Sequence, residues 1–437
     1  MNSGKKCPGI QGNVEKPSQE IIELCRFMKH QKNWKNDTML CVREFPGTGR
    51  GLYSRKVLEG NSEIIDLPFD ALISLKSISE DERFLMFMLE VSDGKFKWKM
   101  QTLLTIFLLW NWHLGDKSPW KAYLRSLPKE LYHPHFCSVD ELVASPVVSE
   151  RVIDSVNQSE VKEVQKVLQN AVCPCCSEKF FPDLFPKRKF IEFYLICNSR
   201  TVYIPPDTIK SMIRESKALD LISNEPNMAL APFLDLINHS DSTKTLCSLA
   251  KRGPGFFYTL KTSTKFDKGQ QIFINYGPHC NMKLLIEYGF FLPENSNEFI
   301  EVSMTDIEEL IKKLKRNHQN LQIPSNKFRY IRDHNLHEKM FIEASRFSHN
   351  LEIVLHFLLL DRNIYENNYH QVVFGNIPEE SCLTEYKILL INQLLDHYRE
   401  SLRNLQALES LTKCGKIVRK FLECRIEFMT KCLNKNQ

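Results

Sequence analysis

The chain has 437 residues, which is longer than one ordinary domain, so we expect two or three domains. Hydrophobic residues make up 43% and charged residues 25%, which is typical of a globular protein with a buried core. The net charge of +5 is a weak basic bias over this length and does not indicate direct nucleic-acid binding.

Cysteine usage indicates a reducing compartment. The chain has 14 cysteines, a number that suits a disulfide scaffold only in a short secreted protein. The first thirty residues lack the apolar core of a signal peptide, and no apolar run is long enough to span a bilayer. We therefore expect mostly free thiols, a cytoplasmic or nuclear location, and no membrane partner.

The residue pattern of the amino-terminal half is first polar, then typical of strands and then typical of helices. Residues 2–18 are polar and predict a disordered leader, within an amino-terminal segment 1–37. Residues 38–75 alternate strand-like runs with turns. Residues 80–225 have helical spacing, including the apolar run 102–115 and a Val/Ile pattern over 149–172.

A residue pattern typical of strands returns over residues 230–303. Two runs flanking the turn 251–255 predict a hairpin, and residues 270–277 alternate as a strand. Residues 282–291 predict a short helix that ends at Gly289, and from 305 onward the chain reads as almost entirely helical. The expected fold class is α+β, with a β core over 38–303, a helical insert at about 80–225 and an all-helical domain over 304–437.

Three short motifs carry polar residues suited to chemistry. The first, Phe45 to Tyr53, contains three glycines in five positions, which is typical either of a tight turn or of a close approach to a ligand. The second, Phe233 to Ser240, places Asp, Asn and His after an apolar run, and the third ends a strand with Tyr276 and Gly277. Each alone is compatible with an ordinary turn or a packing tyrosine.

In this order, the three motifs resemble those of SET-domain protein methyltransferases. The segment 118–128, the pair 199–200, the run 235–239 and the strip 288–290 are similar to the Rubisco large-subunit methyltransferase-like branch. The resemblance covers residues 40–305 by motif and the helical carboxyl terminus by architecture, where this branch has a substrate-binding domain. It implies an S-adenosylmethionine-dependent protein-lysine N-methyltransferase, with histones among the candidate protein or peptide substrates.

The resemblance also implies roles for single residues. Tyr276 matches the active-site tyrosine. The residues that match cofactor-binding positions come from the glycine turn, the end of the helical insert, the Asp-Asn-His turn, the tyrosine itself and the following strip: Thr48, Gly49, Arg50, Arg200, Asp235, Asn238, His239, Tyr276, Tyr288, Gly289 and Phe290.

These residue types suit methyl transfer from a sulfonium. Glycines let main-chain groups reach the amino-acid end of the cofactor. Transfer is an in-line displacement, so the main demand is to align amine, methyl and sulfur. A phenol with a pKa of about 10 would orient these groups rather than act as a strong base. Histidine methylation by the same fold and a catalytically inactive peptide-binding module are the alternatives.

The segment Cys173-Pro-Cys-Cys176 is a further cysteine-rich motif. Three thiols in four residues lack the paired spacing that tetrahedral zinc sites favour, and a fourth ligand would have to come from elsewhere, such as Cys137 or Cys197. We therefore expect a loop of free thiols and no metal site.

Overall fold

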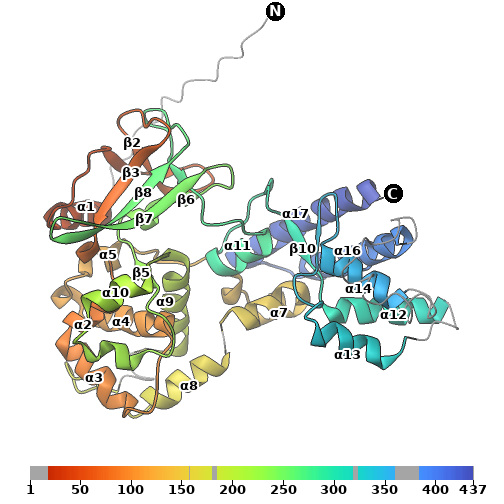
Figure 1. Ribbon diagram of the computed structural model, residues 1–437, viewed down its shortest axis with the longest axis horizontal. Helices are drawn as coiled ribbons and strands as arrows, with labels where there is room; N and C mark the ends of the chain where they lie inside the picture. Colours follow the sequence, from red (N-terminus) through yellow and green to blue (C-terminus); the bar gives the residue numbers. More distant parts are fainter. Residues whose placement is uncertain (1–17, 157, 180–184, 318–322, 360–382, 437) are drawn as a thin grey trace, which may run out of the picture. The chain divides into compact units, whose positions relative to one another are not determined.

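The computed structural model describes residues 18–436, except 157, 180–184, 318–322 and 360–382. It divides the chain into two compact units (Figure 1). The first contains residues 1–129 and 162–277, and the second contains residues 130–161 and 278–437. Among the described residues, no helix combines the length and apolar character needed to cross a bilayer.

Short antiparallel pairings make up most of the β structure of the first unit. The central three-stranded sheet has the order β3-β8-β7, and the predicted hairpin is its β7-β8 pair, with Arg252 opposite Gly255 at the turn. β6 and β9 form the one parallel pair among the described strands. The strands are β1 (Leu40–Phe45), β2 (Gly49–Ser54), β3 (Ser62–Pro68), β4 (Thr201–Tyr203), β5 (Met228–Leu230), β6 (Asn238–His239), β7 (Thr245–Arg252), β8 (Gly255–Thr262) and β9 (Phe273–Ile274).

Helices form a separate layer of this unit next to the strands (Figure 1). The predicted apolar helix is α4, whose residues are buried from Thr102 to Asn111 on every face, because it lies inside the helical layer and packs on α9. The helices are α1 (Gln19–His30), α2 (Leu75–Glu80), α3 (Glu82–Ser92), α4 (Met100–Leu114), α5 (Lys121–Ser126), α8 (Gln158–Leu168), α9 (Lys187–Arg200) and α10 (Pro206–Met212).

The structure modifies two predictions for the first 172 residues. Nearly all of the predicted leader, residues 2–18, lies outside the described residues, but residues 19–30 form α1, an amphipathic helix that buries Leu24 and Met28. The Val/Ile pattern over 149–172 forms two helices rather than one. The first of them, α7 (Pro146–Ser155), begins at a proline, which suits the first turn because its missing N–H needs no partner there.

The second unit is mainly helical and has one continuous core. Leucine, isoleucine and phenylalanine side chains from most of its helices are buried together, including Leu351, Leu390 and Phe421. Its elements are α6 (Val139–Ala144), α7, α11 (Asn281–Tyr288), β10 (Phe299–Glu301), α12 (Met304–Asn317), α13 (Ser325–Asp333), β11 (Phe341–Glu343), α14 (His349–Leu359), α16 (Thr384–Gln406) and α17 (Lys413–Asn436).

The structure differs from the helical reading of this region at one strand, and its two compact units divide at other residues than the predicted domains. Residues 341–343 form a strand because they pair with β10, so the expectation of helix there was wrong. Residues 130–161, which fall inside the predicted insert, belong to the second unit because Val148 and Val152 are buried in its core. The division at 277/278 also precedes the predicted division at 303/304, since α11 and β10 contribute to the same core.

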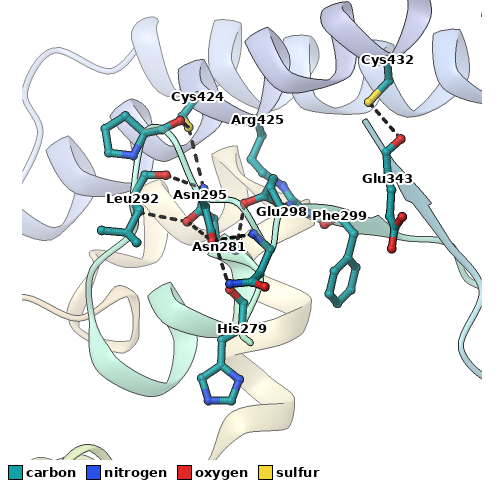
Figure 2. A network of polar contacts seen from close by, with 12 residues as sticks. His279, Asn281, Leu292, Asn295, Glu298, Phe299, Glu343, Cys424, Arg425 and Cys432 are labelled. Atoms are coloured by element: carbon teal, nitrogen blue, oxygen red, sulfur yellow. Dashed lines mark hydrogen bonds and ion pairs between the residues drawn. The ribbon is translucent and has the colours of Figure 1, made fainter. Parts of the chain in front are cut away.

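A buried polar network joins α17 to the segment before α12 (Figure 2). Asn281 donates to the carbonyl of Leu292 at 2.7 Å, and its backbone N–H donates to Glu298 Oε2 at 2.9 Å. Glu298 forms an ion pair with Arg425, whose side chain is 2% exposed and also donates to the carbonyl of Phe299 at 2.8 Å. Burial raises the pKa of Glu298, and the charge of Arg425 opposes that rise. Arg425 therefore stabilises a buried carboxylate whose charged form would be unfavourable in free energy without a cation nearby.

Replacing one member of this pair should cost more than replacing both. Arg425→Met leaves Glu298 buried without its cation, so the unfolding free energy should fall by about 3–5 kcal/mol. The double variant Glu298→Gln/Arg425→Met removes the uncompensated charge and should recover part of that loss. Urea unfolding of the four proteins in the double-mutant cycle measures the coupling. Strictly additive losses would show that the two side chains do not stabilise each other.

Candidate functional site

The three sequence motifs meet in the first unit. The glycine turn joins β1 to β2, and the backbone of β2 bonds the third motif, since Ile272 N–H donates to the carbonyl of Leu52 at 2.8 Å. The parallel pairing of β6 with β9 places Asn238 opposite Phe273 and His239 opposite Ile274. Residues separated by more than 180 positions in the sequence are therefore neighbours, as the resemblance implies.

Side chains tie the glycine turn to the other two motifs. Asn238 Nδ2 donates to the carbonyl of Arg50 at 3.0 Å and lies 3.4 Å from the carbonyl of Thr48. Thr48 Oγ1 donates to Gln271 Oε1 at 3.0 Å. The turn is thus held from two sides by amide side chains. Asn238 was predicted as a site residue, whereas Gln271, which lies within the predicted strand 270–277, was not.

Two glycines of the turn are needed for different reasons. Gly49 has φ +70°, a conformation that side chains with a Cβ rarely adopt. Gly51 has ordinary φ but no free space: a Cβ there would lie 2.6 Å from Gln271 Nε2 and 3.0 Å from Asn238 Nδ2. The first glycine shapes the turn and the second allows the motifs to approach each other.

A buried ion pair joins the helical layer to the Asp-Asn-His turn. Arg200, the last residue of α9, places its NH1 3.0 Å from Asp235 Oδ2 and 3.1 Å from the Asp235 carbonyl. The two side chains are 19% and 2% exposed. Burial acts to lower the pKa of Arg200, but Asp235 and the nearby Tyr123 together outweigh it, so the pKa is raised. Arg200 and Asp235, which were both predicted as cofactor-binding residues, therefore form an ion pair with each other.

A tyrosine and a second arginine complete this cluster. Tyr123 of α5 donates its hydroxyl to Asp235 Oδ2 at 2.9 Å, and burial followed by the carboxylate charge raises the pKa of Tyr123. Arg50 NH1 donates to the carbonyl of Ser126 at 2.8 Å, and burial and the nearby Arg200 lower the pKa of Arg50. Tyr123 lies in the segment 118–128 that carries part of the resemblance, but it was not predicted as a site residue, because nothing local indicates its contact with Asp235.

Tyr276 lies beside His239 and is oriented at both ends. Its hydroxyl donates to the carbonyl of Ile237 at 2.7 Å, and its backbone N–H donates to His239 Nδ1 at 3.1 Å. The two rings lie with centroids 5.1 Å apart. The phenol hydrogen is thus used by a backbone carbonyl, which leaves the oxygen lone pairs as acceptors.

Asp235 Oδ1 and Gln271 Nε2 are buried polar atoms at these motifs, and neither has a hydrogen-bond partner among the described residues. One is an acceptor and the other a donor. Buried polar atoms are normally satisfied, so an unpaired acceptor and donor beside a glycine turn fit a ligand that carries both kinds of group. The amino-acid end of S-adenosylmethionine, with its amine and carboxylate, is such a group.

The predicted strip Tyr288, Gly289 and Phe290 belongs to the second unit and is described within it. Gly289 ends α11 with φ +80°, as predicted, and a Cβ there would lie 3.0 Å from the carbonyl of Tyr132. The Tyr288 ring stacks on that of His279 at 6.1 Å and lies 6.1 Å from that of Phe290. Burial, followed by the charge of Glu287, raises the pKa of Tyr288.

A buried histidine supports this strip. His133 is 4% exposed, with its Nε2 2.6 Å from the carbonyl of Ile286 on α11. Its Nδ1 accepts from the backbone N–H of His135 at 3.0 Å. This arrangement requires the neutral ring with its proton on Nε2, and burial lowers the pKa of His133 from 6.5 to about 4.

We expect Gly51→Ala to disrupt the junction of the motifs. The new Cβ must displace Gln271 or Asn238, so the unfolding free energy should fall by about 1–3 kcal/mol, as for overpacking in a core. Thermal unfolding of the purified variant measures this. Gly255→Ala is the control, because a Cβ there would meet only Phe257 at 3.6 Å without positive φ. Equal unfolding temperatures for the two variants would contradict the proposed crowding.

The neutral state of His133 should make the protein sensitive to mild acid. The folded chain binds this proton only near pH 4, whereas the unfolded chain binds it near pH 6.5. Stability from this group is therefore complete above pH 6.5 and is lost as pH falls toward 4, by about 3 kcal/mol. His133→Gln should flatten the stability profile over that range. The exposed His30→Gln serves as control, and an unchanged profile in His133→Gln would contradict the assignment.

No model of a known protein family matches the chain. The mouse protein named SET domain-containing protein 4 is 30% identical over 309 residues, which are 68% of this chain and 64% of the mouse protein. The protein of the same name from Artemia parthenogenetica is 26% identical over 418 residues, 95% of each chain. The alignment with the mouse relative thus spans less than two thirds of its length.

Solved structures show the same fold. The SET domain of LSMT bound to lysine and AdoHcy superposes with a TM-score of 0.62 at 16% identity, over 96% of this chain and 92% of that one. Rubisco LSMT bound to AdoMet superposes with a TM-score of 0.58 at 15% identity and the same coverage. In sequence and in fold, with the three motifs brought together, the chain is therefore similar to SET-domain proteins of the branch that includes Rubisco LSMT.

Proposed function

We propose that this chain transfers a methyl group from S-adenosylmethionine to a lysine side chain of a protein substrate. The observation that carries the proposal is the position of Tyr276, with its hydroxyl held by the carbonyl of Ile237 and its ring beside His239, next to the junction with the glycine turn. The family resemblance and the solved relative that holds lysine and AdoHcy support it.

The residues at the junction fit the cofactor. Main-chain groups of Thr48 to Arg50 are accessible in a turn whose glycine has φ +70°. Asp235 Oδ1, an acceptor, would pair with the amine of the cofactor, and Gln271 Nε2, a donor, would pair with its carboxylate. When bound, the cofactor supplies an electrophilic methyl group on a sulfonium.

The chain's own residues must orient the reactants. Because the Tyr276 hydroxyl donates to Ile237, its oxygen can accept weak bonds from polarised C–H groups or a bond from the substrate amine. The substrate lysine must lose its proton to react, and transfer out of water lowers the pKa of an amine. Tyr276 therefore acts by alignment, and the proton leaves to solvent before transfer.

A cavity in the second unit suits a basic peptide. It has a volume of about 700 Å³, and most of its charged side chains are acidic. Its two arginines are paired with glutamates, Arg151 with Glu301 at 2.8 Å and Arg425 with Glu298. Glu309 is itself paired with Lys313 at 3.1 Å. The acidic residues of the lining are Glu150, Glu301, Asp306, Glu309 and Glu400. We therefore propose that the target lysine lies in a positively charged segment, of which a histone tail is one example.

Tyr276→Phe tests the proposed role. Loss of one oriented hydroxyl should slow methyl transfer by about ten- to a thousand-fold, while S-adenosylmethionine affinity changes little because the glycine turn is intact. Tritium transfer from labelled cofactor to lysine-bearing proteins measures the rate, and calorimetry measures binding. Mass spectrometry identifies the methylated residue.

The control is Tyr203→Phe, at a tyrosine that is 65% exposed on β4. It should retain both rate and affinity. A folded wild-type chain that binds neither S-adenosylmethionine nor its demethylated product would defeat the proposal. Near-normal transfer by Tyr276→Phe would assign the orienting role to another residue, and label on histidine would change the substrate class.

A further inference from the structure

Three thiols and an imidazole converge in the first unit, away from the motifs described above. Cys173, Cys175 and Cys176 lie in the loop after α8, and His113 lies in the last turn of α4. One ligand atom from each lies within 4.8 Å of every other. The sequence reading expected no metal site and considered Cys137 or Cys197 as a fourth ligand, whereas the structure brings His113 to the thiols.

Three of the distances between ligand atoms are slightly shorter than the edges of a tetrahedral site. His113 Nε2 lies 3.0 Å from Cys175 Sγ and 3.4 Å from Cys176 Sγ. Cys173 Sγ lies 3.1 Å from Cys175 Sγ. In a tetrahedron with Zn–S bonds of about 2.3 Å and Zn–N bonds of about 2.0 Å, neighbouring ligand atoms are about 3.5–3.8 Å apart. A small outward movement of the side chains would therefore accommodate one ion.

The backbone of the loop turns the three thiols to one side. Val172 and Lys179 bridge as in a hairpin, and Cys173 N–H donates to the carbonyl of Glu178 at 2.7 Å. Within it, Ser177 has φ +63° and its N–H donates to the carbonyl of Cys173 at 2.9 Å. A positive φ at a residue other than glycine costs free energy, so other interactions of the folded loop must compensate for that cost.

The loop is also fixed to the helical layer. Arg83 of α3 donates to the carbonyl of Pro174 at 3.0 Å. The ring of His113 packs edge-on against Phe185 with centroids 6.1 Å apart, which limits its rotation. Side chains that are held in place before a metal arrives lose little freedom on binding it.

The ligand set selects the ion. Thiolates and imidazole prefer zinc over calcium or magnesium, which prefer oxygen ligands. The thiols are not a disulfide, since the Sγ atoms of Cys173 and Cys175 are 3.1 Å apart, well beyond the bond length of about 2.05 Å. Three Cys and one His fill four positions and leave none for water or substrate, which is typical of structural zinc sites.

We propose that His113, Cys173, Cys175 and Cys176 bind one Zn²⁺ in a closed structural site. The ion would fasten the end of α4 to the loop between α8 and α9. The last residue of α9 is Arg200, the partner of Asp235. Zinc would therefore hold in place the helical layer that supports the Asp-Asn-His turn, independently of whether the chain proves to be a lysine methyltransferase.

The metal content of the full-length chain tests this directly. Protein expressed with zinc and purified without chelator should contain about one zinc per chain by plasma mass spectrometry. Cys175→Ser and His113→Gln should each lower the content at least several-fold, whereas Cys247→Ser, at an exposed free cysteine on β7, should leave it unchanged. Cobalt in place of zinc should give the intense visible bands of a tetrahedral thiolate site, and these should weaken in Cys175→Ser.

Several results would overturn the assignment. Folded wild-type protein that lacks zinc after purification and takes up neither zinc nor cobalt would do so. Zinc retained at full content in Cys175→Ser would place the metal elsewhere. A disulfide between two of the three cysteines in protein prepared under reducing conditions would assign them to redox chemistry. If Cys175→Ser fails to fold, chelation of the wild-type chain at constant pH, followed by a fall in its unfolding temperature that added zinc reverses, supplies the test.

Discussion

The first unit depends on the buried pair of Arg200 and Asp235. A carboxylate that is 2% exposed is tolerable only with a cation and hydrogen bonds, and here it has Arg200 and the hydroxyl of Tyr123. These two partners come from α9 and α5, so one charge requirement fixes two helices relative to the Asp-Asn-His turn. That turn in turn holds the glycine loop through Asn238. The helical insert is therefore not an appendage of the β core but supplies the counter-charge that positions it.

Much of this arrangement could be predicted from the sequence because its signals are local. The glycine cluster, the hairpin of β7 and β8, the apolar helix α4 and the stop at Gly289 each follow from a short run of residue types. The features that could not be predicted depend on contacts with residues far away in the sequence. β11 became a strand because β10 lies beside it, and residues 130–161 joined the second unit because their apolar faces are buried there. Periodicity indicates that a face will be buried, but not against which part of the chain.

The glycine turn shows how a local reading leaves two explanations open. From sequence alone, its glycines suited a tight turn as well as a ligand site. The structure separates them by position: Gly49 needs positive φ, while Gly51 is required by the side chains of Gln271 and Asn238. The crowding at Gly51 comes from residues about 190–220 positions later, which no local pattern records. The same limitation hid His113, which reaches the cysteine loop from a helix 60 residues earlier.

The second unit cannot simply be removed to learn what it does. Its core includes α7 and α11 as well as the carboxyl-terminal helices, so a cut after β10 would expose apolar side chains on both sides. The cut would also remove Arg425 and with it the ion pair that Arg425 forms with Glu298. A truncated chain that lost activity would therefore report unfolding as readily as loss of substrate binding. Single changes among the acidic residues that line the cavity, which keep the core and the ion pair, separate the two explanations because they alter charge without altering burial.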